Sequence, residues 1–334
     1  MIKMYKIGIV GGSGYIGTNL ASSLCDQFNV RVIDVKPPKI VSEKIEFISC
    51  DITKYDALSS VVEDLDILIH SAIIQIPLIN EKKKLAYDVN VIGTQNVCRV
   101  VDETPRIKGM ILAGSWHVIG ERGLKGIIDE EFGFRPDKVD DRARLYAISK
   151  ICQESITRFY SEMSEKIYGI IRQGTVLGLD MPEKTAANIF IENGLKGKPI
   201  TPFKHSMYRP MLYVDINDIC KAFNIFCTKI LDNKISKKTN SLDSIINLYY
   251  PEPMTILGLA EEVKESIVKA TDGKITPQIE ILDEHLPIAF DKKDKEKIKV
   301  NIQKASEFLG LDKLTSPRES IERIVRSKLD KQSV

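Results

Sequence analysis

Several features are missing from this 334-residue chain, and each absence removes a class of function. The six cysteines never form a Cys-x-x-Cys pair, and the four histidines show no ligand spacing. We therefore expect reduced core cysteines, no disulfide framework and no metal site. No apolar run approaches the roughly 20 residues of a membrane span, and a strand is predicted directly at the N-terminus, so we expect no signal peptide. These absences predict a cytoplasmic protein with no membrane partner.

A charge excess of one sign is also missing. Lysine plus arginine total 48 and aspartate plus glutamate 46, which leaves a net charge of +2. Such a balance gives no reason to expect nucleic acid as a partner. The hydrophobic fraction of 43% is ample for a large core, and no internal repeat or long linker divides the chain.

Short apolar strands and helices alternate strictly along the first half of the chain. This order predicts an α/β fold of the Rossmann type, in which a doubly wound parallel sheet carries helices on both faces. We expect the stretch from 82 to 103 to be one long helix and the stretch from 121 to 142 to be a loop. Strands are expected near residues 6–10, 30–34, 44–50, 66–72, 108–114, 167–172 and 245–249, with helices near 55–62, 145–160, 186–197, 216–226, 255–270, 304–310 and 317–328.

The chain opens on a glycine-rich turn between a strand and a helix. Gly11, Gly14 and Gly17 follow an apolar strand, and Tyr15 and Ile16 begin the helix. Glycine lets the backbone approach a pyrophosphate, and the helix N-terminus offers it N–H groups and partial positive charge. The alternative is a glycine turn that binds nothing, but the position directly after an apolar strand favours dinucleotide binding.

Asp34 ends the next apolar strand, seventeen residues beyond Gly17. In a dinucleotide fold a carboxylate there bonds the adenosine ribose, and it repels a 2′-phosphate, so NAD is favoured over NADP. A strand-end turn residue is the alternative. Asp51 after the third strand suits an adenine contact, or else a helix cap. The fourth strand ends in Ser71 and Ala72, which are small enough for a cofactor to pass closely.

Tyr146 and Lys150 are four residues apart and share one face of a predicted helix. A neighbouring ammonium favours the phenolate, so the pair is a workable proton acceptor for an alcohol. A surface helix pair is the alternative. Ser115 follows the fifth strand at the edge where open α/β sheets bind ligands. There its hydroxyl is expected to hydrogen-bond the reacting oxygen of a substrate. The alternative is a turn serine without a role in the reaction.

Together these motifs resemble the extended short-chain dehydrogenase/reductases, in the NAD-dependent epimerase/dehydratase branch of the UDP-glucose 4-epimerase type. The likeness follows the family's order along nearly the whole chain. It implies NAD as the cofactor and Ser115, Tyr146 and Lys150 as the catalytic set. The cofactor contacts that it implies are Gly11, Gly14, Tyr15, Ile16, Gly17, Asp34, Asp51, Ile52, Ser71, Ala72, Asn90, Tyr146 and Lys150.

The resemblance is weaker in the segments that would contact the substrate. It implies that Ser115, His117, Thr175 and Arg209 contact the substrate, with Arg209 on a phosphate. Thr175, however, replaces the family's asparagine, and the usual Gly-Asp-Gly turn before Arg209 is missing. Trp116 and His117 stand where dehydratases and decarboxylases carry acids, which disfavours both reactions. His117 is either an acid, base or substrate contact, or a hydrogen-bonded loop histidine.

The predicted organisation is a cofactor domain over residues 1–178, to which residues 213–250 return, and a smaller, mostly helical substrate region over 179–212 and 251–334. The predicted activity is epimerisation of a nucleotide sugar by hydride transfer to and from NAD. The alternatives are a dehydrogenase or ketoreductase for a small or non-nucleotide alcohol and a non-catalytic NAD-sensing module. The family also implies a homodimer through the helices at 82–103 and 145–160, although Val97, Val100 and Val101 suit a core equally well.

Overall fold

The computed structural model describes residues 4–39, 42–235 and 240–332. The chain divides into two compact units. Unit 1 comprises Met1–Gly120, Gly133–Gln173 and Ile219–Asn247, and unit 2 comprises Glu121–Phe132, Gly174–Asp218 and Leu248–Val334.

Unit 1 is built on a seven-stranded sheet. Its pairings from β3 to β7 are all parallel. This is the doubly wound order in which strand sequence reverses at β1, so the predicted Rossmann fold is confirmed. Across the sheet the strands are β11 (Ile245–Leu248), β7 (Ile167–Gln173), β5 (Gly109–Ser115), β4 (Ile67–His70), β1 (Lys6–Val10), β2 (Asn29–Asp34) and β3 (Ile45–Ser49).

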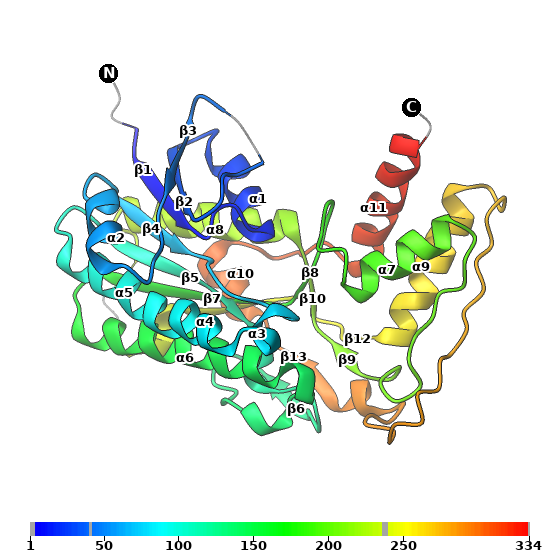
Figure 1. Cartoon of the computed structure of the whole chain (residues 1–334). Coiled ribbons are helices and arrows are strands. Elements are labelled where there is room, and N and C mark those ends of the chain that lie inside the picture. The colour runs from blue at the N-terminus through cyan, green and yellow to red at the C-terminus, as the bar shows by residue number, and fades with distance from the viewer. Residues whose placement is uncertain (1–3, 40–41, 236–239, 333–334) are drawn as a thin grey trace. The chain divides into compact units, whose positions relative to one another are not determined.

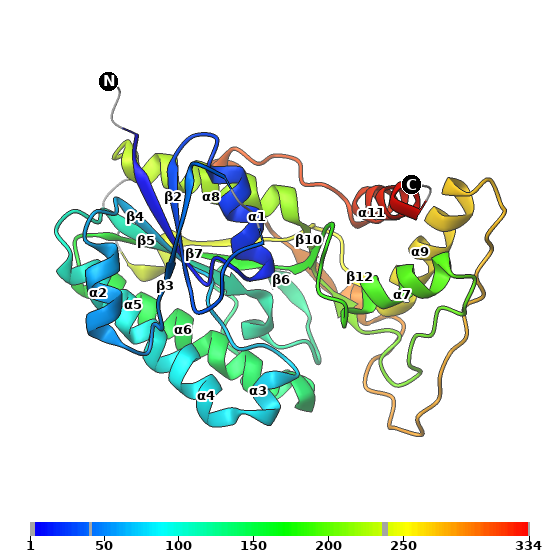
Figure 2. The ribbon, with the colours of Figure 1, turned by 45° about the horizontal axis from the view of Figure 1, so that its top comes forward.

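Helices cover both faces of this sheet (Figures 1 and 2). On one face lie α2 (Tyr55–Val62), α5 (Thr94–Glu103) and α6 (Arg144–Met163), and on the other lie α1 (Tyr15–Leu24) and α8 (Ile216–Leu231). Val97, Val100 and Val101 of α5 are buried in the apolar core beneath the first face. They therefore belong to the core of one subunit, which decides between the two interpretations of these valines.

The predicted long helix from 82 to 103 is wrong in detail. The chain instead forms α3 (Leu78–Glu81), α4 (Lys83–Tyr87), a π-helical turn η1 (Asp88–Gly93) and then α5. A π-turn widens a helix locally and is often found beside functional sites. Periodicity alone cannot reveal it, because the apolar spacing changes by only one residue.

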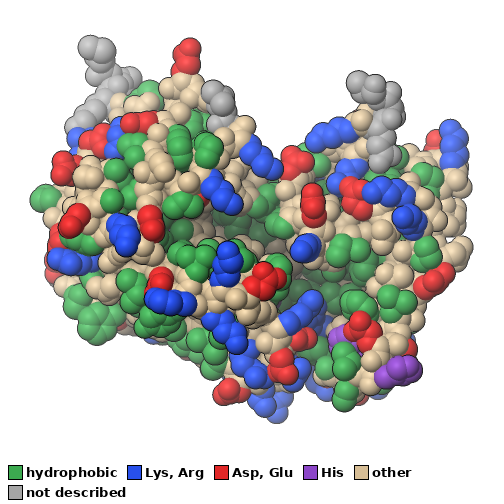
Figure 3. All heavy atoms as spheres, viewed as in Figure 1, with side chains coloured by type: hydrophobic (Ala, Val, Ile, Leu, Met, Phe, Trp, Pro, Cys, Tyr) green, Lys and Arg blue, Asp and Glu red, His purple; other side chains and the backbone are tan. Residues whose placement is uncertain are grey.

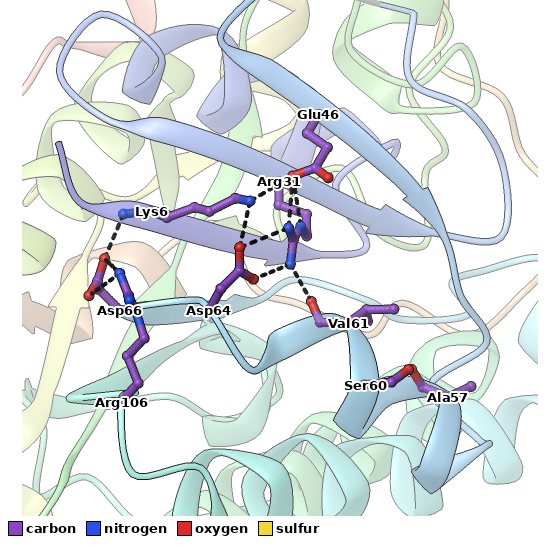
Figure 4. Close-up of polar contacts among 9 residues, drawn as sticks. All are labelled: Lys6, Arg31, Glu46, Ala57, Ser60, Val61, Asp64, Asp66 and Arg106. Carbon is purple, nitrogen blue, oxygen red and sulfur yellow. Dashed lines mark hydrogen bonds and ion pairs between the residues drawn. The ribbon is translucent and has the colours of Figure 1, made fainter.

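A cluster of charged side chains links the first strands of unit 1 (Figure 4). The guanidinium of Arg31 on β2 is paired with Glu46 on β3 at 2.9 Å and with Asp64 at 2.5 Å. Lys6 on β1 also reaches both carboxylates at 2.8 Å. These contacts lower the pKa of Asp64 to about 2, against the opposing effect of its burial. Electrostatic pairing thus supports the order of the strands that position the glycine turn.

Unit 2 consists of small sheets and a helical group. Helices α7 (Ala186–Leu195) and α11 (Pro317–Gln332) both pack against α9 (Ile256–Ala270). The predicted loop from 121 to 142 contains a short strand that sequence reasoning missed, because three residues are too few to show a period. The paired strands are β6 (Gly126–Ile128) with β13 (Ile298–Val300), β8 (Thr175–Leu177) with β10 (Tyr213–Asp215), and β9 (Pro210–Met211) with β12 (Met254–Thr255).

The shorter elements complete the description. They are η2 (Trp116–Ile119), η3 (Pro136–Lys138), η4 (Asp141–Ala143), η5 (Ser241–Ser244), η6 (Asp294–Lys297) and α10 (Gln303–Leu309). Among the helices that the structure describes, none is long and apolar enough to cross a bilayer. Positive and negative side chains are interspersed over the face drawn in Figure 3 rather than gathered by sign.

Candidate active site

The glycine turn between β1 and α1 leaves no room for side chains at two positions. A Cβ atom added to Gly11 would lie 2.5 Å from the backbone of Ala72, and Gly11 has a positive φ of 76°. A Cβ atom on Gly17 would lie 2.4 Å from the carbonyl oxygen of Gly11. Gly14 is the N-cap residue of α1, without a side-chain cap. The turn therefore brings bare backbone up to the first turn of the helix, which holds Tyr15 and Ile16.

Asp34 lies at the end of β2, beside the glycine turn. Its carboxylate accepts hydrogen bonds from the backbone N–H groups of Ser13, at 3.2 Å, and Lys36, at 3.1 Å. Ser13 in turn donates its hydroxyl to the carbonyl of Lys36 at 2.6 Å. These bonds hold one acid at the carboxyl edge of the sheet, next to the helix that would take the pyrophosphate.

The residues after β3 and β4 that are predicted to contact the cofactor make hydrogen bonds within the chain. Ser71 donates its hydroxyl to the carbonyl of Val10 at 2.9 Å, which ties β4 to the glycine turn. Asp51 accepts the N–H of Thr53 at 2.9 Å, as in an Asx-turn, and the carbonyl of Ile52 accepts Asn96. The cofactor contacts expected of Asp51, Ile52, Ser71 and Ala72 stay predictions.

Asn90 lies in the π-turn η1 and is fully buried. Its side-chain oxygen accepts the N–H of Ile74 at 2.7 Å, and its amide donates to the carbonyl of Ile74 and to Ser149 on α6, both at 3.2 Å. Asn90 therefore fixes the segment after β4 against the helix that carries Tyr146 and Lys150.

Lys150 is 4% exposed, and its ammonium donates to the carbonyl of Ala113 at 2.8 Å and to Gln153 at 3.0 Å. Burial lowers the pKa of Lys150 to about 7. Gln153 passes the network on, with bonds to Thr94 at 3.0 Å and to the carbonyl of Ala72 at 3.1 Å. Sequence reasoning missed Gln153, although its place three residues after Lys150 on one helix face was a usable signal.

His70 at the end of β4 belongs to the same network and was also missed. Its Nε2 lies 2.8 Å from the Thr94 hydroxyl, and the ring has no exposed surface. Burial, followed by the charge of Lys150, lowers the pKa of His70 to about 3. The imidazole is therefore neutral at physiological pH and supports the strand end rather than exchanging protons.

Ser115, His117 and Tyr146 meet at the end of β5. Ser115 caps the η2 turn by accepting the N–H of His117 at 3.3 Å, and its hydroxyl lies 3.2 Å from His117 Nδ1. The ring centroids of His117 and Tyr146 are 5.5 Å apart in an edge-to-face arrangement. Burial raises the pKa of Tyr146, and a hydrogen bond with Ser115 opposes that rise. That Lys150 lowers the pKa of Tyr146 stays a prediction.

Two side chains on β7 complete this end of unit 1. Arg172 is buried and donates two hydrogen bonds to Glu154 of α6, at 3.0 and 2.7 Å, which fixes α6 to the sheet. Gln173 lies opposite Ser115 in the strand register and is 2% exposed. Within the described part of the chain neither atom of its amide has a hydrogen-bond partner.

Thr175 and Arg209, the other two predicted substrate contacts, belong to unit 2. The backbone of Thr175 pairs in register with Tyr213. The guanidinium of Arg209 lies 3.5 Å from the carboxylate of Glu121, and both residues are buried. Sequence reasoning did not foresee Glu121 beside this arginine, because nearly ninety positions separate them in the chain.

The geometry fits a bound dinucleotide. Two glycines leave the backbone of the turn without side chains, and Asp34 is fixed beside this turn. The amine of Lys150 is buried against the carbonyl of Ala113 on β5. A model of the NAD dependent epimerase/dehydratase family matches residues 7–240. The chain belongs to this family. It is therefore an NAD-dependent enzyme of the epimerase/dehydratase family, which confirms the expected family, cofactor and enzymatic nature.

Curated relatives are distant. A 3 beta-hydroxysteroid dehydrogenase/Delta 5-->4-isomerase of Mycobacterium tuberculosis is 25% identical over 58% of this chain. A GDP-6-deoxy-D-talose 4-dehydrogenase of Aggregatibacter actinomycetemcomitans is 26% identical over 69% of this chain and 72% of its own length. The match spans 53% of the steroid enzyme and 41% of an uncharacterized protein of Sinorhizobium fredii, so the chain covers about half the length of such relatives.

Solved structures of the family share the whole fold. A UDP-glucuronic acid 4-epimerase of Bacillus cereus, in complex with UDP-glucuronic acid and NAD, has a TM-score of 0.75 and 21% identity, and the match covers 97% of this chain and 99% of that one. At such identity the likeness establishes the fold alone.

Proposed function

We propose that this enzyme transfers a hydride between a secondary alcohol carbon and NAD, with Tyr146 as the proton acceptor. The observation that carries the proposal is that Ser115 and Tyr146 both contact His117 at the end of β5, in a unit whose Lys150 is buried and whose glycine turn fits a dinucleotide. Bound NAD supplies the hydride acceptor.

Three residues of the chain have separate roles in the proposed reaction. Tyr146 takes the hydroxyl proton of the substrate, and Ser115 holds the reacting oxygen beside it. Lys150, with a pKa of about 7, is poised to change charge near neutral pH, and its bonds to Ala113 and Gln153 hold it in place. A cation near the phenol favours its ionised form, so we propose that Lys150 offsets the effect of burial on Tyr146.

The first candidate reaction is epimerisation of a nucleotide sugar. The family supports it, and the B. cereus neighbour binds UDP-glucuronic acid. In this reaction the keto intermediate takes the hydride back on its other face, and NAD is unchanged overall. We propose that Arg209 contributes to holding the diphosphate, as a charge-assisted pair.

The substitution Tyr146→Phe tests the proposed chemistry. We expect turnover to fall by at least about 10²-fold, because the proton acceptor is lost, while NAD binding measured by calorimetry persists. The probes are UDP-glucose and UDP-glucuronic acid, with products read by NMR. Tyr160→Phe on the same helix is the matched control, since its hydroxyl bonds Gln95 away from the site. Equal turnover in the two variants would contradict the role of Tyr146.

A second candidate is net oxidation of an alcohol that carries no phosphate. The buried carboxylate of Glu121 lies beside Arg209 and already balances its charge. A diphosphate placed there would meet a buried acid, which is costly. The steroid enzyme among the relatives above is named as a dehydrogenase, which also favours this candidate.

Glu121→Gln separates the two candidates. If Glu121 keeps phosphates away from Arg209, the amide should tighten the binding of UDP by roughly tenfold, because the opposing charge is removed. Calorimetry with UDP alone gives the readout. Glu131→Gln, an exposed acid of the same segment, should leave UDP affinity unchanged. Tight UDP binding by the unmodified protein, unaffected by Glu121→Gln, would favour the nucleotide sugar.

We also propose that the enzyme is a homodimer. On the outer face of α6, Ile148, Phe159 and Met163 are 40%, 65% and 57% exposed. Leu85, Tyr87 and Ile92 of the neighbouring α4 and η1 segment are 41%, 57% and 40% exposed. Apolar residues gathered on adjacent helices support a partner surface, and a second copy of this chain would bury both sets.

A further inference from the structure

The side chain of Gln153 lies inside unit 1, one turn beyond Lys150 on α6, and has no exposed surface. Its amide oxygen accepts the Lys150 amine at 3.0 Å. Its amide nitrogen donates to the carbonyl of Ala72 at 3.1 Å and to the hydroxyl of Thr94 at 3.0 Å. Both polar atoms of the amide are therefore bonded, and the amide connects the amine to the segment after β4 and to α5.

The orientation of this amide is set by groups that can only accept a hydrogen bond. A carbonyl oxygen has no proton to give, so the nitrogen of Gln153 must face Ala72 and its oxygen must face Lys150. The Thr94 hydroxyl donates its single proton to the carbonyl of Asn90 at 2.8 Å, so its oxygen is an acceptor toward Gln153 as well. The opposite orientation would place an oxygen 3.1 Å from the Ala72 oxygen. Lys150 is therefore the donor in its bond to Gln153.

Lys150 meets a second group that can only accept. Its Nζ donates to the carbonyl of Ala113 on β5 at 2.8 Å. Two oxygens thus point their negative ends at one nitrogen, and hydrogen bonds to the charged form of a group favour that form. Burial has the opposite effect and lowers the pKa of Lys150 to about 7. Loss of the Gln153 oxygen should therefore lower the pKa of Lys150 further.

We propose that Gln153 is a positioning residue, which holds the Lys150 amine against β5 and keeps it charged. Its amide oxygen supplies the acceptor, and its bonds to Ala72 and Thr94 prevent the amide from turning away. The proposal rests on the proposed function, in which the charge of Lys150 favours the phenolate of Tyr146. Gln153 acts through Lys150, so no contact with the substrate is assigned to it.

Other titratable groups lie near this amine. The Nε2 atom of His70 on β4 is 3.5 Å from the Gln153 nitrogen, and the ring is neutral because its pKa is lowered to about 3. Tyr146 and Glu154 are four residues before and after Lys150 on the same face of α6. The carboxylate of Glu154 is paired with Arg172 on β7 at 2.7 Å, which balances its charge.

The other elements packed against α6 are β5, α3, α5 and the turns η1 to η5. Burial raises the pKa values of Cys98 on α5 and Tyr168 on β7, so both are neutral. Asp88 of η1 pairs with Lys84, and η2 carries the half-buried His117. The charged side chains of α3, α5, η3, η4 and η5 are exposed. A substitution at Gln153 leaves all these groups in place, so a change in the titration of Lys150 reports the lost contact.

The contact can be tested without cofactor or substrate. In protein labelled with [ε-¹³C]lysine, the NMR signal of Lys150 is identified by its loss in Lys150→Arg. Gln153→Met keeps the length of the side chain but removes the acceptor, so we expect the titration midpoint of Lys150 to fall by about one pH unit. Gln153→Glu places a carboxylate at the acceptor and should raise the midpoint. Gln95→Met on α5 removes an amide that bonds Tyr160, and it should leave the midpoint unchanged.

Opposite shifts in the two variants separate positioning from a structural role. A structural disturbance would move the Lys150 midpoint in the same direction in Gln153→Met and Gln153→Glu, and that result would overturn the proposal. An unchanged midpoint in both variants would overturn it as well. If Gln153→Met does not fold, Gln153→Glu decides alone: a higher midpoint supports the proposal, and an unchanged or lower one overturns it.

The consequence for the reaction is measured as the pH dependence of turnover with NAD and UDP-glucose or UDP-glucuronic acid. Rising pH removes the charge of Lys150, so the alkaline limb should move to lower pH in Gln153→Met and to higher pH in Gln153→Glu. An unmoved limb, in a protein whose Lys150 midpoint has shifted, would overturn the role of Gln153 and leave that of Tyr146 standing. Turnover unaffected by Tyr146→Phe would instead contradict the proposed function, and the titration of Lys150 would still decide the contact.

Discussion

His70 shows how a single buried side chain links stability to pH. Its folded pKa of about 3 lies below the ordinary value of 6.5 because the ring is buried and faces Lys150. The unfolded chain binds the proton more readily between these two values. The contribution of His70 to stability is therefore complete above pH 6.5 and is lost progressively as the pH falls toward 3.

We predict that His70 alone removes about 2 kcal/mol of folding free energy between pH 7 and pH 5. Urea unfolding at the two pH values gives the measurement. In His70→Gln, the glutamine amide can still hydrogen-bond Thr94. The part of the pH dependence of stability that comes from His70 should vanish, and the parts that come from other groups should remain. An equal pH dependence in the two proteins would contradict a neutral, buried His70.

At the scale of the element, the glycine turn opposes helix propensity. Gly17 lies inside α1, where alanine is intrinsically preferred by about 1 kcal/mol. The structure predicts the opposite effect, because an added Cβ atom would lie 2.4 Å from the Gly11 carbonyl oxygen and 2.6 Å from Gly12 Cα. These are backbone atoms, so the whole turn would have to move.

Gly17→Ala should therefore destabilise the protein by about 1–3 kcal/mol and weaken NAD binding. Thermal unfolding and calorimetry with NAD measure the two effects. Gly133→Ala is the matched control, since an added Cβ atom there has no atom within 4 Å and the residue has no positive φ. If Gly17→Ala raised the melting temperature, helix propensity would outweigh the close contact and the turn would be less constrained than described.

At the scale of the whole molecule, the exposed apolar residues of α6 predict self-association. Phe159→Glu combined with Met163→Glu should convert the proposed homodimer to monomer, because charges would be buried in the interface. Sedimentation velocity at micromolar concentration gives the readout. Phe203→Glu, which changes an exposed aromatic residue of unit 2, should leave the mass unchanged. A protein that is already monomeric before substitution would contradict the proposed dimer.

Most of the fold could be predicted from the sequence because its signals are local. The apolar strands, the glycine spacing and the amphipathic helices each depend on neighbours within a few residues, and α2 was expected at the bounds it has. The π-turn η1 and the short strand β6 could not be predicted in this way. Both are stabilised by partners far along the chain, as Asn90 is by Ile74 and Ser149.

By itself the sequence determined the α/β class and the cofactor. It also predicted Ser115, Tyr146 and Lys150 as a catalytic set, because motif spacing on a strand or helix implies which residues share an edge or face. Only the tertiary structure decided what surrounds them. It brought Gln153 within hydrogen-bond distance of Lys150 and Ser115 within hydrogen-bond distance of His117. It also paired the carboxylate of Glu121 with the guanidinium of Arg209. Burial and long-range pairing control proton affinity and charge balance. They depend on chain segments that are distant in sequence and meet only when the protein folds.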